Sequence, residues 1–476
     1  MDNNKIVHAF SDDVLSNHDG LALARLIASK ALQPAEVIEA AIVRARRVEP
    51  ELNAIAFNCF SQALEQAEHT ARNMAPSVFA GVPTFVKDNT PVAGLPTQYG
   101  CDAFRAGPES KTGPYARQYL AQGFTLLGKS ALPEFGLNAT TEPAHRQVTP
   151  NPWNTDYSAG ASSGGAAALV AAGVVPIAHA NDGGGSIRIP AACCGLIGLK
   201  PSRGRHLNSD HARFLPINIV SEGVVSRSVR DTAYFHAGAE TYYRNKKLPP
   251  IGLVERPNKK RLRIAVVTQS ISGTQIDSHT LKAVEKTANE LSDLGHYVEF
   301  AALPVKSTFA EDFGLYWAML AYTLQLSGRA TINRNFDARR LDGLTMGLGH
   351  YFKRHVHLMP GAFKRLKQGG RQYLAMFERY DVLLMPVLSH TTPELGYINP
   401  QTPFDVLKDR LSAYVGFTPL ANVSGGPAIS LPACLTEHHL PVSIQLAANV
   451  GRERTLLELA YELEQARFWT EKPLWQ

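Results

Sequence analysis

Apolar side chains recur every three or four residues in several stretches of the chain, which predicts amphipathic helices. The pattern occurs at residues 21–31 and 34–48, where Pro34 suits the first turn of a helix. It returns at residues 281–294, directly before Gly295, and again at 454–465. Glycine after the last apolar position is a common helix stop. We therefore expect helices at these four places.

Short apolar runs bounded by polar or turn-forming residues lie between these stretches, a pattern typical of buried strands. The first run ends directly before Lys87. Strand and helix alternate along the chain, which predicts an α/β fold. Because neither an internal repeat nor a linker is evident, we expect one domain over residues 1–476. The runs cover residues 82–86, 124–127, 262–267, 298–300, 382–385, 429–431 and 442–446.

The composition is that of an ordinary globular protein, with 45% hydrophobic and 19% charged residues among 476. A formal net charge of +6 is too small to indicate nucleic-acid binding. The five cysteines form no CxxC pair and no zinc-ligand spacing. Residues 1–10 lack an apolar signal core, and the longest nonpolar run, 166–178, is too short to span a bilayer. We expect a cytoplasmic protein without an integral membrane segment or a nucleic-acid partner.

Three consecutive glycines precede a serine in the segment from Gly183 to Ser186. Their N–H groups can turn toward one point and hold the negative oxygen of a tetrahedral intermediate while the serine attacks. A phosphate-binding loop would need a Gly-Lys-Ser/Thr sequence or spaced glycines before a helix, and here Ile189-Pro190 follows. The glycine-rich region 157–201 also contains apolar runs, which a flexible linker lacks.

A serine nucleophile needs a base, and histidine is the usual one. His179 lies seven residues before Ser186 in an apolar context, which favours a core histidine, and no Gly-x-Ser-x-Gly elbow is present. A second serine cluster at 160–165 contains Ser162, twenty-four residues upstream of Ser186. Lys87 follows the first predicted strand and, taken alone, would be interpreted as a surface lysine.

Taken together, these motifs resemble the amidase signature family over about residues 20–465. The resemblance implies an α/β amidase-signature fold, with a large mixed central sheet covered by helices on both sides. It also implies a helical segment over about 1–75, a signature core over about 76–235 and a variable substrate-pocket region over about 300–375. The motifs are Val86-Lys87-Asp88-Asn89, Ser162-Ser163-Gly164-Gly165, Gly184-Gly185-Ser186-Ile187-Arg188, Gly195-Leu196-Ile197-Gly198-Leu199-Lys200-Pro201 and Pro427-Ala428-Ile429-Ser430-Leu431-Pro432.

The resemblance further implies a catalytic triad with Ser186 as nucleophile, Ser162 as proton relay and Lys87 as base. Burial disfavours the charged form of a lysine, so Lys87 at the end of a dry strand can act as a base. Such an enzyme cleaves a carbon–nitrogen amide bond through an acyl-enzyme intermediate and needs no cofactor or metal. The peptide between Ala161 and Ser162 is expected to be cis, and Gly183, Gly184 and Gly185 are the expected oxyanion-binding residues.

This chain departs from the family pattern at two places. Ala161 stands where glycine usually precedes the relay serine, and Asn181-Asp182-Gly183 replaces Thr-Asp-Thr or Ser-Asp-Thr. The segment Asp182-Gly183-Gly184-Gly185-Ser186, with Cys193-Cys194-Gly195 after it, resembles the branch of 6-aminohexanoate cyclic-dimer hydrolases. Ser163 is interpreted either as support for the relay by hydrogen bonding or as a plain turn serine. Asp182 and Arg188 are expected to order the glycine-rich loop rather than to take part in catalysis.

Other features leave alternatives open. His350, His355 and His357 lie among basic residues, a poor setting for a metal ion. The basic segment 353–371 is either a lid over the substrate or a membrane-contact surface, and we favour the lid. Aromatic residues and one methionine on a helical spacing either line a substrate channel or pack in the core. These residues are Phe313, Tyr316, Trp317, Met319 and Tyr322.

The leading interpretation is a free-standing amidase whose partner is a small-molecule amide; the sequence leaves a homodimer open. One alternative is the A subunit of a tRNA-dependent amidotransferase. That branch has Gln where this chain has Ile189, and Asp-Gln-x-Gly-Pro near Ser221-Glu222-Gly223, so both positions disfavour it. Another alternative is a non-catalytic binding protein on an amidase scaffold, which the intact Lys87, Ser162 and Ser186 disfavour.

Overall fold

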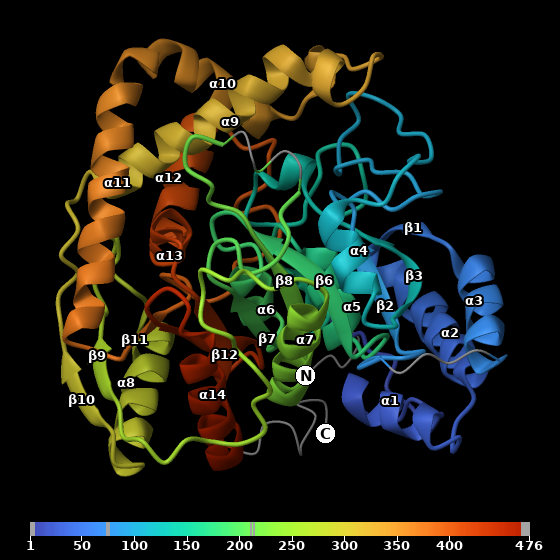
Figure 1. Ribbon diagram of the computed structural model, residues 1–476. Coiled ribbons are helices and arrows are strands. Elements are labelled where there is room, and N and C mark those ends of the chain that lie inside the picture. Colours follow the sequence, from blue (N-terminus) through green and yellow to red (C-terminus); the bar gives the residue numbers. More distant parts are fainter. Residues whose placement is uncertain (1–4, 73–76, 210–211, 213–214, 468–476) are drawn as a thin grey trace.

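A mixed sheet of eight strands forms the centre of the molecule in this computed structural model (Figure 1). The structure describes residues 5–72, 77–209, 212 and 215–467. The strands are ordered β10-β9-β11-β13-β12-β7-β8-β6 across the sheet. Their bounds are β6 Ile177–Asp182, β7 Ile197–Lys200, β8 Ser221–Ser226, β9 Arg263–Val266, β10 Tyr297–Phe300, β11 Val382–Pro386, β12 Ala428–Leu435 and β13 Pro441–Ala447.

Strand pairing in the sheet changes from parallel at one edge to antiparallel at the other. At the outer edge β10, β9 and β11 pair in parallel, whereas all pairs from β11 to β6 are antiparallel. The hairpin β12–β13 lies in the middle, and β6 forms the edge that leads into the glycine loop. The sheet therefore ends on the strand that delivers the candidate nucleophile.

A second, three-stranded sheet has the order β1-β3-β2 and carries the candidate base. In it β2 pairs in parallel with β3, and β1 pairs antiparallel with β3. A two-stranded ladder, β4–β5, lies apart from both sheets. Their bounds are β1 Ile55–Asn58, β2 Pro83–Lys87, β3 Thr125–Ser130, β4 Pro150–Asn151 and β5 Asn154–Ser158.

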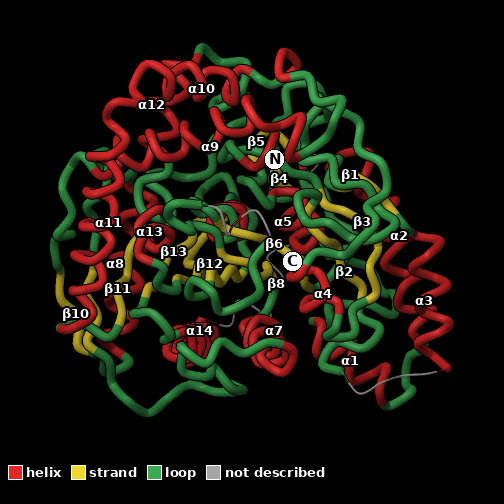
Figure 2. Tube along the Cα trace, turned by 45° about the horizontal axis from the view of Figure 1, so that its top comes forward, coloured by secondary structure: helices red, strands yellow, loops and turns green. Residues whose placement is uncertain are grey.

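Helices cover both faces of the central sheet, as the tilted view shows (Figure 2). Alternate residues of β9 belong to different hydrophobic clusters, with Ile264 and Val266 in the cluster that includes α8 and α14 residues. Ala265 belongs instead to the cluster that contains α9, α11 and α13 residues. This alternation is what a strand with two buried faces requires.

The helices in chain order have the following bounds. They are α1 Gly20–Ala28, α2 Pro34–Leu52, α3 Phe60–Arg72, α4 Pro114–Leu120, α5 Gly164–Ala171, α6 Arg188–Cys193, α7 Val229–Tyr242, α8 Ser278–Asp293, α9 Phe309–Thr331, α10 Gly343–His355, α11 Met359–Ala375, α12 Phe404–Tyr414, α13 Pro419–Ser424 and α14 Glu453–Arg467. Short 3-10 turns lie at η2 Glu134–Gly136, η4 Ala338–Arg340, η5 Val356–Leu358 and η6 Met376–Glu378.

The predicted fold class is confirmed. The four predicted helices correspond to α1, α2, α8 and α14, and each predicted strand lies within or overlaps an observed one. The division into one domain with three segments stays a prediction. Within the described residues, no helix combines the length and the apolar character needed to cross a membrane.

Candidate active site

Lys87 occupies the last position of β2, a strand that is buried along its whole length. Its Nζ donates to Ser162 Oγ at 2.7 Å and to Asn181 Oδ1 at 2.8 Å. Burial lowers the pKa of Lys87 to about 7, although the carboxylates of Glu222 and Asp182 act in the opposite direction. A large part of the Lys87 population is therefore a neutral amine near pH 7, the form that can accept a proton.

Ser162 lies two residues before α5, and the peptide that joins it to Ala161 is cis, as predicted. The side chain is buried. The backbone of η2 passes close to its hydroxyl, because a Cβ added at Gly136 would stand 2.8 Å from Ser162 Oγ. Ser163 Oγ donates to the carbonyl of Asn181 at 3.4 Å, a long hydrogen bond. Ser163 thus contacts the end of β6, whereas Ser162 contacts Lys87 at the end of β2.

Asp182, the last residue of β6, fixes the glycine loop through hydrogen bonds with the loop backbone. Its carboxylate accepts the N–H of Gly185 at 2.7 Å and the N–H of Ile187 at 3.2 Å. It also pairs with Arg188 at 2.9 Å, and both side chains are fully buried. Burial is the largest single effect and opposes the Asp182 charge, but Arg188, Lys200 and Asn422 together outweigh it and keep the pKa of this carboxyl well below its usual range. This geometry agrees with the interpretation of both residues as structural.

The loop backbone limits which N–H groups can face a substrate. The Gly185 N–H is engaged by Asp182, whereas Gly183 and Gly184 are half-exposed. Gly185 has a φ of +138°, and a Cβ there would stand 2.5 Å from Thr418 Oγ1. Only glycine fits this position. The N–H groups of Gly183, Gly184 and Ser186 remain as candidate oxyanion donors.

Ser186 follows the glycines two residues before α6 and is half-exposed. Its hydroxyl makes no hydrogen bond to any residue that the structure describes. The structure therefore brings Lys87 and Ser162 into direct contact, while the step from Ser186 to Ser162 stays a prediction.

Asn181 is a site residue that sequence reasoning missed. It pairs with Asn89 in both directions, since each side-chain amide donates to the other's carbonyl oxygen at 3.1–3.2 Å. Asn181 Oδ1 thereby accepts from Asn89 and from Lys87 at once. The available signal was its departure from the family's Ser or Thr, one residue before Asp182.

His179 is buried, as expected of a core histidine, but it also contacts the backbone of the candidate base. Its Nδ1 accepts the N–H of Lys87 at 3.1 Å, and its Nε2 lies 3.1 Å from Glu222 Oε2. Sequence reasoning assigned no role to Glu222. His179 and Glu222 therefore form a hydrogen-bonded chain that ends on the backbone of Lys87.

Apolar side chains from α9 and from the segment before β8 stand over the glycine loop. A Cβ on Gly184 would stand 3.4 Å from the Phe313 ring, and one on Gly183 would stand 3.7 Å from Val220. Among the aromatic residues in question, Phe313 thus lies at the loop. Tyr316 is buried and donates to the carbonyl of Ile217 at 2.6 Å, so it belongs to the core.

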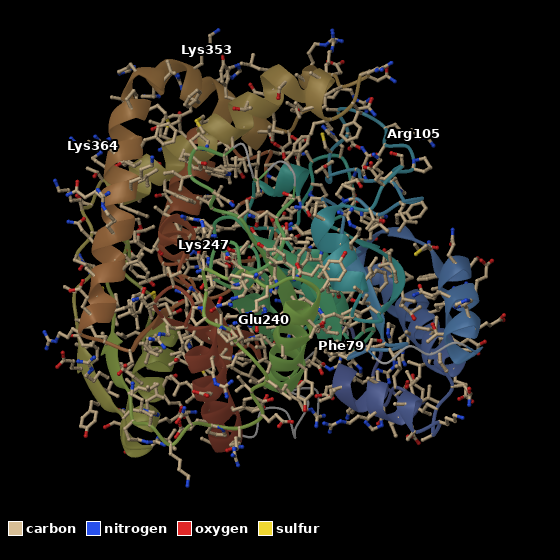
Figure 3. All side chains as sticks on the ribbon, in the orientation of Figure 1. Phe79, Arg105, Glu240, Lys247, Lys353 and Lys364 are labelled. Atoms are coloured by element: carbon tan, nitrogen blue, oxygen red, sulfur yellow. The ribbon has the colours of Figure 1, made fainter. Side chains whose placement is uncertain are left out.

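The basic segment 353–371 spans the end of α10, η5 and most of α11. Lys353 and Lys364 project from the outer side of these helices (Figure 3). In the same segment, the exposed Arg365 pairs with the buried Asp312 of α9 at 2.6 Å. Among the described residues, no group of three or more His, Cys, Asp or Glu side chains could hold a metal ion.

Comparison with known proteins identifies the class to which this fold and site belong. The chain belongs to the amidase family, whose sequence profile matches residues 36–457. It is accordingly an amidohydrolase that acts on carbon–nitrogen bonds other than peptide bonds.

Two relatives and one solved structure are similar to this chain over nearly its whole length. The chain is 50% identical over 467 residues to "Putative amidase AmiC" of Mycobacterium tuberculosis, with 97% of each chain covered. It is 34% identical to the 6-aminohexanoate-cyclic-dimer hydrolase of Paenarthrobacter ureafaciens, with 95% of each covered. A solved structure of 6-aminohexanoate cyclic dimer hydrolase superposes with a TM-score of 0.85 at 29% identity, covering 96% of this chain and 98% of that one.

Proposed function

We propose that this protein hydrolyses amides through a Ser186–Ser162–Lys87 triad and an acyl-enzyme intermediate. The observation that carries the proposal is the 2.7 Å contact between the buried Lys87 Nζ and Ser162 Oγ. Asn181 Oδ1 accepts one N–H of the amine. The lone pair of a neutral Lys87 is then left to accept the Ser162 proton.

In the proposed acylation step, Ser186 Oγ attacks the amide carbon while its proton passes to Ser162 Oγ. Ser162 in turn gives its own proton to Lys87, which becomes an ammonium. The tetrahedral oxygen is held by the N–H groups of Gly183, Gly184 and Ser186. When the carbon–nitrogen bond breaks, the proton returns through Ser162 to the leaving amine. Water then attacks the ester, with the same relay as base.

We infer a substrate class of linear or cyclic amides with methylene-rich chains, of the 6-aminohexanoate type. Two observations support it. Phe313 and Val220 present apolar surface to the glycine loop, which suits a chain of methylene groups. The relative at 34% identity is named for a cyclic dimer of this kind.

Two other functions make different predictions. The A subunit of a tRNA-dependent amidotransferase would act only with a second subunit and tRNA. A non-catalytic binding protein would retain an amide substrate without turnover. We favour the free-standing enzyme over the amidotransferase subunit because Ile189 and Ser221-Glu222-Gly223 depart from the motifs of that branch. We favour it over a binding protein because Lys87, Ser162 and Ser186 are all retained, and because the lysine is buried and bound as a base requires.

The test is a panel of linear and cyclic amides offered to the purified chain alone, in the presence of EDTA. We expect turnover that Ser186→Ala, Ser162→Ala and Lys87→Ala each reduce about a thousandfold or more, since the three residues act as a unit. Ser292→Ala, on the exposed side of α8, is the matched control and should leave the rate unchanged. Turnover that needs tRNA and a partner, or that EDTA abolishes and zinc restores, contradicts the proposal.

A further inference from the structure

Strands β2 and β6 lie against each other where the two sheets meet, yet each belongs to a different ladder. β2 ends at Lys87, and β6 leads to the glycine loop. Besides the contact of Lys87 Nζ with Asn181, two hydrogen bonds that involve side chains cross this seam. Thr84 Oγ1 donates to the carbonyl of Ile177 at 2.9 Å, and the N–H of Lys87 donates to His179 Nδ1 at 3.1 Å. The second bond fixes the end of β2, where the base is attached.

The proton positions on His179 follow from its partners. A backbone N–H can only donate, so Nδ1 must be the unprotonated nitrogen. Nε2 then carries the proton and donates it to Glu222 Oε2 at 3.1 Å. Burial lowers the pKa of His179, in keeping with a neutral ring, and Tyr115 packs on it at a centroid distance of 5.0 Å. The ring is thus held in one tautomer and one orientation.

Glu222 is anchored on β8, two residues from the partner of His179 in the β6–β8 ladder. Both side chains lie on the same face of the sheet, as residues two apart do. The Glu222 side chain is buried, and its described hydrogen-bond partner is His179. A neutral imidazole does not cancel the charge of the carboxylate, so its field reaches Lys87.

We propose that His179 and Glu222 are positioning residues that hold the base-bearing strand against the nucleophile loop and stabilise Lys87 as it takes up a proton. The inference rests on the proposed function, because it assigns Lys87 as the base. His179 fixes the backbone from which the lysine side chain extends. Glu222 supplies a buried negative charge that offsets the ammonium formed during acylation.

The charges of the other ionised groups around Lys87 are offset by oppositely charged neighbours. Asp182, at the end of β6, pairs with Arg188, and Lys200 of β7 also lies within its field. Lys129 on β3 pairs with Asp88 at 3.3 Å. From α4, the neutral rings of Tyr115 and Tyr119 pack on His179. Glu222 therefore has the least compensated charge of the groups that face this amine.

The first experiment compares two replacements of His179. His179→Leu fills the volume but makes neither hydrogen bond, and we expect kcat to fall about 10- to 100-fold with KM changed less than about twofold. His179→Gln can accept from the Lys87 N–H and donate to Glu222, and should recover most of the loss. His236→Leu is the matched control, because His236 is equally buried but bonds to His206. Thermal unfolding verifies that each variant is folded.

The second experiment follows the pH dependence of kcat/KM in Glu222→Gln. Glutamine still accepts from His179 but carries no charge, so the pKa of Lys87 should fall and the acidic limb should move to lower pH by about one unit. Glu142→Gln is the matched control, since Glu142 is buried and bonds instead to Thr140, Gly396 and Asn399. The acidic limb of the Glu142→Gln variant should stay at the same pH as that of the unmodified protein.

The outcomes separate this inference from the proposed function. A His179→Gln variant that is folded but as inactive as His179→Leu overturns the positioning role. An unchanged limb in Glu222→Gln overturns the electrostatic role. If Ser186→Ala keeps wild-type turnover, the proposed function fails, whatever the His179 variants do. If Ser186→Ala is inactive and His179→Leu is fully active, only the present inference fails.

Discussion

At Lys87, burial and two carboxylates act on the same amine in opposite directions. Burial is the larger effect and brings the pKa to about 7, while Glu222 and Asp182 raise it. The proposed base must be neutral to accept a proton. Its neutral fraction grows as pH rises through the folded-state pKa, so activity should grow with it.

We therefore predict an acidic limb in the pH profile of kcat/KM with a midpoint near 7, falling about tenfold per pH unit below it. Lys200 is the informative control, because it is also buried and its pKa is also lowered to about 7, mainly by burial. Lys200→Met should keep the limb in place if Lys87 sets it. A limb near pH 5, or one that disappears with Lys200, would argue against Lys87 as the base.

Single residues also show which parts of the site could be predicted from the sequence and which could not. Lys87 and Ser162 were predicted because motifs surround them, and the structure joins them at 2.7 Å. Asn181 and His179 were not assigned roles, because their contacts with Lys87 depend on how β2 packs against β6. No local pattern encodes that contact between residues more than ninety positions apart.

At the scale of elements, the strand–loop–helix unit from β6 to α6 is held by one buried ion pair. Asp182 accepts two loop N–H groups and pairs with Arg188. The guanidinium also donates to Gln445 at 2.6 Å and to Asn422 at 2.7 Å, which ties the loop to β13 and α13. Removing one charge would leave the other buried without its partner.

We predict that Asp182→Asn lowers the free energy of unfolding by about 3 kcal/mol, since breaking a buried pair costs about 3–5 kcal/mol and Arg188 keeps other acceptors. Urea denaturation measures it. Asp409→Asn removes one partner of the exposed Lys408–Asp409 pair and should change stability by less than about 0.5 kcal/mol. Equal effects in both variants would contradict the structural role given to Asp182.

Element positions were predictable from periodicity, whereas their exact ends were not. The predicted strand at 124–127 extends to Ser130, because pairing with β2 continues through Lys87. The run 166–178 contains the end of a helix, a turn at Gly173 and the start of β6. Continuous apolar character cannot separate a buried helix from a buried strand.

At the scale of the whole molecule, the fold joins two sheets so that base and nucleophile loop come from different ones. The α/β class follows from the alternation of elements. The strand order and the change from parallel to antiparallel pairing do not, because pairing depends on contacts between distant segments. For the same reason the assignment of Phe313 to the glycine loop needed the placement of α9.

The most direct test of this account is to map a covalent adduct by mass spectrometry of peptides after treatment with a fluorophosphonate. Such a reagent captures an activated serine. The account predicts one adduct, on Ser186, which forms much more slowly in Lys87→Ala. An adduct on Ser162 or on the buried Ser430, or labelling of Ser186 at an unchanged rate without Lys87, would contradict it.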